Sequence, residues 1–115
     1  MAVIAANAAS SAVGVVTVVK TVLGASDTLQ FSAGQAQTLV LENDTGSPVN
    51  INIDGDKAVA FVPGGIGAPV DLSLGFTVIV PSGSAVAVAL KNIQRFLVGV
   101  VTVTGGAGAK AYVLT

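Results

Sequence analysis

Short runs in which apolar and polar residues alternate extend along most of the chain. The clearest is VNINID at 49–54, where Val and Ile occupy every second position. A period of two places successive side chains on opposite faces of a strand. This run therefore predicts a strand with Ile51 buried and with Asn50 and Asn52 on the outer face. Further β-rich runs lie at 15–23, 27–31, 36–42, 57–63, 69–74, 76–81, 85–90, 97–105 and 110–115. In the run at 36–42 we expect Leu39 and Leu41 to face inward.

These runs predict roughly eight to ten strands separated by turns. Val, Ile and Thr are abundant, and their branched side chains fit a pleated sheet better than a helix. Glycines recur about every ten residues, and only 91–96 is predicted as a turn or a single helical turn. We therefore expect an all-β fold, either a sandwich or a barrel.

The N-terminal residues form a segment of different character. Residues 1–12 are apolar and Ala-rich but have neither a helical nor a strand period. They predict an extended N-terminal arm that orders against a partner, with Val3 and Ile4 as contact residues, followed by a single sandwich domain at 13–115. Deletion of residues 2–12 is then expected to leave the domain folded. The N-terminus lacks the basic start of a signal peptide, and polar residues dilute its apolar run, which ends at Lys20, so we expect neither a signal peptide nor a membrane span.

The composition restricts the partners. Hydrophobic residues make up 52% of the chain, charged residues only 10%, and the net charge is −1. The few Lys and Arg residues form no basic stripe, which argues against nucleic-acid binding. In so apolar a chain, either the surface is unusually apolar or much of it is covered by partners.

The chain contains no Cys and no His. Disulfides, thiolate sites and ordinary zinc sites are thereby excluded, and the usual general base is missing. We expect no catalytic residues, no metal site and no cofactor.

One tripeptide, Asp44-Thr45-Gly46, matches the sequence that carries the catalytic aspartate of aspartic proteases. That chemistry needs two carboxylates in an apolar setting that share one proton. Here Glu42 and Asn43 precede the aspartate and Ser-Pro follows the glycine, which favours solvent and a turn. We predict a hairpin loop between two strands.

Two further segments resemble binding motifs. Asn52, Asp54 and Asp56 could offer oxygen ligands to calcium, but the EF-hand spacing is absent, and a hairpin turn at Asp54-Gly55 is the preferred interpretation. The Gly-rich stretches at 63–67 and 105–110 lack the phosphate-loop pattern and predict plain loops.

Lys91 and Arg95 lie near Phe96 and form a small basic cluster. Two interpretations stay open, a solvated turn and a contact with an acidic surface of a partner.

In its style of sequence the chain resembles the small jelly-roll decoration, or cement, proteins of tailed-bacteriophage capsids. The resemblance covers most of the chain and is carried by TLVLENDTGSPVNINIDGD, FTVIVPSGSAVAVAL and GVVTVTGGAGAKAYVL. It implies an antiparallel, jelly-roll-like β-sandwich with an extended N-terminal arm. It also implies a homo-oligomer, dimer or trimer, on the capsid exterior of the virion, which binds the major capsid protein and clamps neighbouring capsomers. The alternative is a non-catalytic binding module for carbohydrate or a host surface, on a virion tail or fibre or in a secreted protein. The low aromatic content, 4% with no Trp, weighs against sugar binding.

Overall fold

The computed structural model describes residues 3–4, 6–7, 18–32, 34, 36–58, 60–61 and 70–114. Within these residues the regular elements are β-strands, apart from one 3₁₀ helix, η3 (Leu90–Phe96). The strands are β1 (Ala6–Asn7), β2 (Thr21–Val22), β3 (Ser26–Leu29), β4 (Thr38–Asn43), β5 (Val49–Gly55), β6 (Ala60–Phe61), β7 (Val70–Asp71), β8 (Phe76–Val80), β9 (Ser84–Ala89), β10 (Val101–Thr104) and β11 (Lys110–Leu114).

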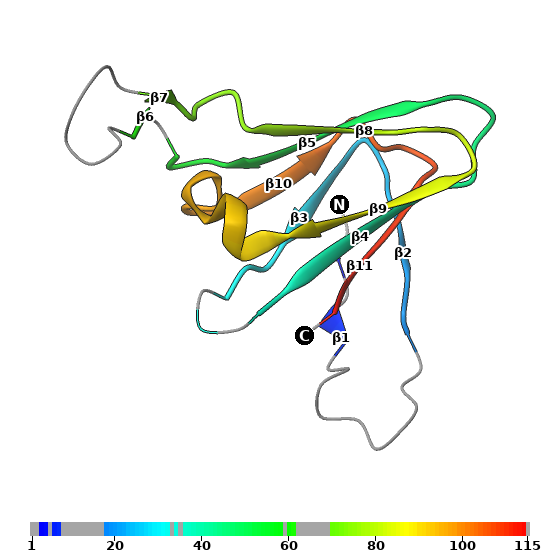
Figure 1. Cartoon of the computed structure of the whole chain (residues 1–115), viewed down its shortest axis with the longest axis horizontal. Coiled ribbons are helices and arrows are strands. Elements are labelled where there is room, and N and C mark those ends of the chain that lie inside the picture. Colours follow the sequence, from blue (N-terminus) through cyan, green and yellow to red (C-terminus); the bar gives the residue numbers. More distant parts are fainter. Residues whose placement is uncertain are drawn as a thin grey trace.

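The strand pairings are nested, like those of one long hairpin (Figure 1). Strand β6 pairs with β7, β5 with β8, β4 with β9, β3 with β10 and β2 with β11, each pair antiparallel. Two more antiparallel pairings, β4 with β11 and β5 with β10, roll this hairpin up on itself.

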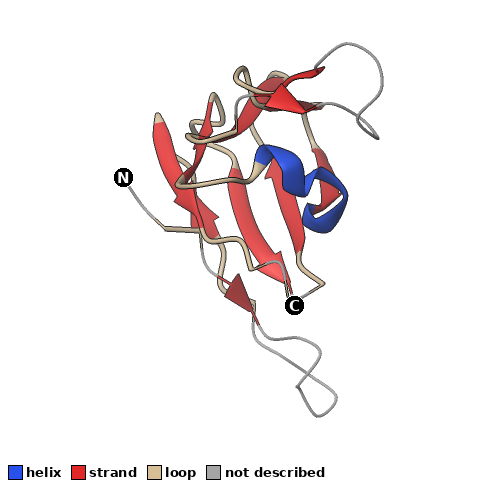
Figure 2. Cartoon of the chain, turned by 90° about the vertical axis from the view of Figure 1, so that its left-hand side faces the viewer, coloured by secondary structure: helices blue, strands red, loops and turns tan. Residues whose placement is uncertain are grey.

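The result is two sheets that pack against each other. The five-stranded sheet has the order β1-β11-β4-β9, with β2 also beside β11, and the four-stranded sheet has the order β3-β10-β5-β8. This arrangement is a β-sandwich with the nested strand order of a jelly roll, as the sequence predicts. In Figure 2 the 3₁₀ helix η3 is the helical segment among these strands.

The core lies between the two sheets and is built from alternate residues of each strand. Leu39 and Leu41 of β4 face Ile51 and Ile53 of β5, and all four side chains are fully buried. The predicted inward register of these two strands is thus confirmed. The rest of the core cluster consists of Ile4, Leu23, Leu29, Val80, Val88, Leu90, Leu97, Val101, Val103, Ala109, Ala111 and Val113.

Two predicted hairpin turns have a different place in the fold. The segment 44–48 is a turn, but it carries the chain from β4 in one sheet to β5 in the other. Asp54 and Gly55 belong to β5 itself, where they pair with Thr102 and Val101 of β10. Gly55 is required there because a Cβ atom would come within 2.5 Å of backbone atoms of Phe96 and Val98. Local turn propensity did not distinguish this close approach from a turn.

The N-terminal residues that the structure describes pack on their own domain, contrary to the expectation from sequence. The Ile4 N–H donates to the Thr28 carbonyl at 2.9 Å, and Ile4 is only 3% exposed. Strand β1 lies parallel to β11, with Ala6 beside Val113. Residues 8–12, most of the remaining arm, lie outside the described residues. Residues 15–17 of the first predicted strand also lie outside them. No helix in the described part of the chain is long and apolar enough to cross a membrane.

Candidate functional site

The residues predicted from sequence to contact a partner fall into two separate groups. Val3 is 54% exposed and forms a parallel bridge with Thr28 at the outer edge of β3. Ile4, its neighbour, is buried in the core, so the expectation that it contacts a partner is corrected: its side chain fills its own domain.

The second group lies on η3, which follows β9. Lys91 and Arg95 are exposed there, in the helical turn that the sequence allowed. Phe96 is partly buried because its ring packs on Phe76 of β8, with ring centroids 5.7 Å apart. Val3 bridges β3 of the four-stranded sheet, whereas η3 continues from β9 of the five-stranded sheet, so these residues do not form one site.

Most of the outward residues of the five-stranded sheet are apolar. On β4 and β11 the residues that alternate with the core are Thr38, Val40, Glu42 and Lys110, Tyr112, Leu114. The registers place Val40 between Tyr112 of β11 and Ala87 of β9. We call this surface the apolar face, and it consists of Val22, Val40, Ala85, Ala87, Ala89, Tyr112 and Leu114.

The outer face of the four-stranded sheet is polar. Its outward residues are Ser26, Thr28, Asn50, Asn52, Asp54, Thr77, Ile79, Thr102 and Thr104. Ile79 is the exception on this face and is 63% exposed. The sandwich therefore offers a polar surface on one side and an apolar surface on the other.

Charged groups gather at one end of the apolar face. Lys20 bonds Glu42 at 3.0 Å, and Lys110 bonds Asp44 at 3.1 Å. The hydrogen bond from Lys20 holds the pKa of Glu42 below its ordinary value, and the same contact raises the pKa of Lys20. Burial and a hydrogen bond with Glu42 raise the pKa of Tyr112. The apolar face thus ends in a row of paired charges.

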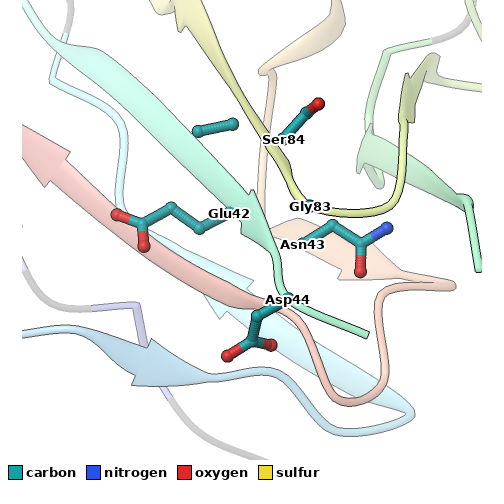
Figure 3. Close-up of a pocket in the computed structure, with 6 residues that line it drawn as sticks. Glu42, Asn43, Asp44, Gly83 and Ser84 are labelled. Carbon is teal, nitrogen blue, oxygen red and sulfur yellow. The ribbon is translucent and has the colours of Figure 1, made fainter. Parts of the chain in front are cut away.

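Asp44 is one of the residues that line a hollow of about 200 Å³ beside the start of β9, and Figure 3 shows these residues. The hollow is lined by Glu42, Asn43, Asp44, Gly83, Ser84 and Ala85. The Asp44 side chain is 61% exposed, and the hydrogen bond from Lys110 keeps its pKa below the ordinary value. A protease dyad instead needs facing carboxylates in an apolar setting, one of them with a raised pKa. This environment does not favour the protease chemistry.

Asn43, not Asp44, organises this corner. It is 1% exposed, and its Nδ2 donates to the carbonyls of Ser47 and Val80, both at 2.9 Å. Its Oδ1 accepts hydrogen bonds from the N–H and the hydroxyl of Thr45. The tripeptide Asp44-Thr45-Gly46 is therefore part of a turn that a buried amide holds in place.

The oxygen-rich segment at 52–56 does not form a cation cage in the described part of the chain. Asn52 donates to the Leu74 carbonyl and to the Thr77 hydroxyl, on the outer face. Asp56 Oδ1 accepts the Val100 N–H at 2.9 Å. Asp54 Oδ1 is buried without a hydrogen-bond partner, but no group of three or more potential ligands surrounds it among the described residues.

On one side of the sandwich short N-terminal segments flank the sheets, and on the other side the sheets end in the longer strands β8 and β9. At the edge of β3, the Ile4 N–H donates a hydrogen bond to the Thr28 carbonyl, and β1 and β2 pair with β11. On the opposite side β8 and β9 are the last strands of their sheets. Within the described residues, no strand pairs with the outer edge of either one.

Sequence reasoning missed the apolar face. Its signal was present, since Leu39-Val40-Leu41 and Ala85-Val86-Ala87-Val88-Ala89 are apolar at successive positions. A strand that is apolar at every position has two apolar faces, of which only one can line the core.

We compared the chain with known proteins, and no family model, curated protein or solved structure matched it significantly.

Proposed function

We propose that the protein is a structural virion protein that binds the outer surface of a tailed-phage capsid and clamps neighbouring capsomers. The observation that supports this proposal best is the apolar face, which leaves apolar side chains on the outside of a sandwich. Apolar faces of this kind on soluble proteins are typical of protein contacts. The major capsid protein is the proposed partner.

A sheet face suits this task because strands hold its side chains in fixed positions. Val22 is 62% exposed, and the alanines of β9 are exposed beside Val40. Each Å² of apolar area buried against a partner contributes about 25 cal/mol. The small alanines of β9 leave that part of the face flat, so that it can lie on another broad surface. Many copies on a symmetric shell would multiply a modest contact by avidity.

The chemistry of the site supports a binding role. The carboxylates beside the hollow, Glu42 and Asp44, are ion-paired with Lys20 and Lys110. Such pairs fix the orientation of a docking surface and are weakened by salt. The proposal therefore includes that the protein is not an enzyme.

The test uses purified protein and expanded capsids of the phage whose particles contain it. Co-sedimentation is measured for the wild type, for Val40→Glu on the apolar face and for Asn50→Glu on the polar face. Val40→Glu is expected to weaken binding at least about tenfold, because it buries a charge against the capsid. Asn50→Glu, also on a central strand, is the matched control and is expected to bind normally.

The location of the protein in the particle gives an independent check. Mass spectrometry of particles separated into heads and tails is expected to find it in the heads, in numbers comparable to the capsomers. Its presence in the tail fraction alone would contradict the proposal and favour the host-surface binding module. Equal loss of binding in the two variants would remove the apolar face as the contact.

A further inference from the structure

We propose that the uncovered edge of β9 pairs with β9 of a second copy of this chain, which makes a twofold dimer with one continuous sheet. This inference does not depend on the proposed capsid role. The free edge, its charge pattern and the position of Lys91 each support it.

The backbone of β9 has unused hydrogen-bonding groups along its outer edge. The Leu90 N–H donates to the Gln37 carbonyl at 3.0 Å and so continues the ladder between β4 and β9. Bonded and non-bonded residues alternate in an antiparallel ladder, so Val86 and Val88 direct their backbone groups toward β4. Ala85 and Ala87 direct theirs away from it. No hydrogen bond to these outward groups is present within the described part of the chain.

The side chains of β9 do not protect this edge. Natural edge strands are usually blocked by charges, prolines, bulges or a covering segment. Strand β9 is Ser-Ala-Val-Ala-Val-Ala, without a charge or a proline, and it is six residues long. Two identical neutral strands can approach each other without electrostatic repulsion, and the small alanines cause no crowding on the shared face.

The outward groups select one register. Antiparallel strands exchange hydrogen bonds between residues that both face the neighbour. Centring the pair on Ala87 achieves this, because Ala87 then lies opposite Ala87 of the partner subunit and Ala85 lies opposite Ala89 of the partner subunit. Glu42 lies beside Ala85 in its own sheet, and Thr38 lies beside Ala89. In this register Glu42 therefore lines up across the interface with Thr38 of the partner subunit, and no like charges are placed together.

The same register brings an exposed cation to the acidic hollow. Lys91 follows β9 by two residues and therefore lies near Gly83 of the partner subunit. Gly83 lines the hollow that also contains Glu42 and Asp44. Lys91 is exposed and has no salt bridge among the described residues. Each copy would thus place one lysine beside the other copy's carboxylates, twice per dimer by symmetry.

A single cysteine tests this geometry, since the chain contains none of its own. Directly opposed residues of a bonded pair have Cα atoms about 5.5 Å apart, which a disulfide can span. Ala87→Cys is expected to form a disulfide-linked dimer under mild oxidation. Ile79→Cys, on the other uncovered edge strand, is the matched control and is expected to stay uncrosslinked.

Sedimentation of the cysteine-free protein completes the test. The wild type is expected to be a dimer, and Ala87→Lys a folded monomer, because two lysines would face each other across the twofold axis. Lys91→Glu is expected to raise the dimer dissociation constant about tenfold, or about 1.4 kcal/mol, whereas Lys57→Glu leaves it unchanged. A monomeric or trimeric wild type, or crosslinking through Ile79→Cys in place of Ala87→Cys, would overturn the inference.

Discussion

The edges of the two sheets differ between the two sides of the sandwich. On one side, Ile4 bonds the edge of β3 and β1 extends along β11. On the other side, β8 and β9 end their sheets without a neighbouring strand in the described structure. The comparison shows that N-terminal segments flank the sheets on only one side of the described structure. A chain that closes one edge with its own residues leaves the other available for a partner.

The largest expected effect concerns the covered side. Ile4→Ala is expected to lower the free energy of unfolding by roughly 2–5 kcal/mol, because a buried side chain is lost and a cavity stays behind. Ile79→Ala, on the uncovered side, removes a side chain that is 63% exposed and is expected to cost less than about 0.5 kcal/mol. Urea denaturation of the two variants measures the contrast. Equal midpoints would show that the N-terminal residues do not stabilise the covered edge.

An intermediate effect is expected at the corner beside the uncovered edges. Asn43→Ala leaves the carbonyls of Ser47 and Val80 without their donor and is expected to cost roughly 1–3 kcal/mol. Asn50→Ala, on the exposed outer face, serves as the control and is expected to change stability by less than about 0.5 kcal/mol. Thermal unfolding at fixed protein concentration measures both. If Asn43→Ala unfolds like the wild type, the buried amide does not hold the turn.

Amide hydrogen exchange detects a smaller difference without altering the core. In the Ala87→Lys protein, the N–H of Val88, directed toward β4, is expected to exchange slowly, and that of Ala85 to exchange quickly. On the covered side the N–H of Ile4 is expected to be protected by its bond to Thr28. NMR spectra recorded after transfer to heavy water give the rates. Fast exchange at Ile4 would make the two edges equivalent.

The smallest effect concerns the paired charges. The folded-state pKa of Asp44 is lowered, so its contribution to stability is present above its ordinary pKa of 3.8 and is lost as the pH falls through the lower folded value. Lys110→Met is expected to raise the pKa of Asp44 toward 3.8, whereas Lys57→Met leaves it unchanged. NMR titration of the Asp44 carboxyl carbon measures the shift. An unshifted titration in Lys110→Met would show that this ion pair is not formed in solution.

Much of the fold was predictable, because a two-residue period is a local property of the chain. Ile51 was placed on its correct face by alternation alone. The path between sheets was not predictable in this way. The turn at 44–48 has the residues of a hairpin but joins two sheets, and the close contacts of Gly55 come from residues about 40 positions away.

The candidate site was less accessible to sequence reasoning. Lys91 and Arg95 were expected on an exposed turn, and that is where they lie. The burial of Ile4 was missed because a short segment that bridges β3 shows no period of its own. The roles of Asn43 and of the β9 edge depend on which strands are neighbours, and neighbours far apart in sequence leave no local signal.

The nested pairing of the strands also constrains how the molecule is made. Thr21 of β2 pairs with Ala111 of β11, about 90 residues further along the chain. Strand β11 lies between β4 and the N-terminal strands, so the five-stranded sheet cannot form before Lys110–Leu114 has left the ribosome. Contacts of such sequence separation make folding slow, on the order of milliseconds to seconds. Until β11 has been made, the apolar strands β4 and β9 lack the third strand of their sheet, and exposed apolar strands of this kind favour aggregation.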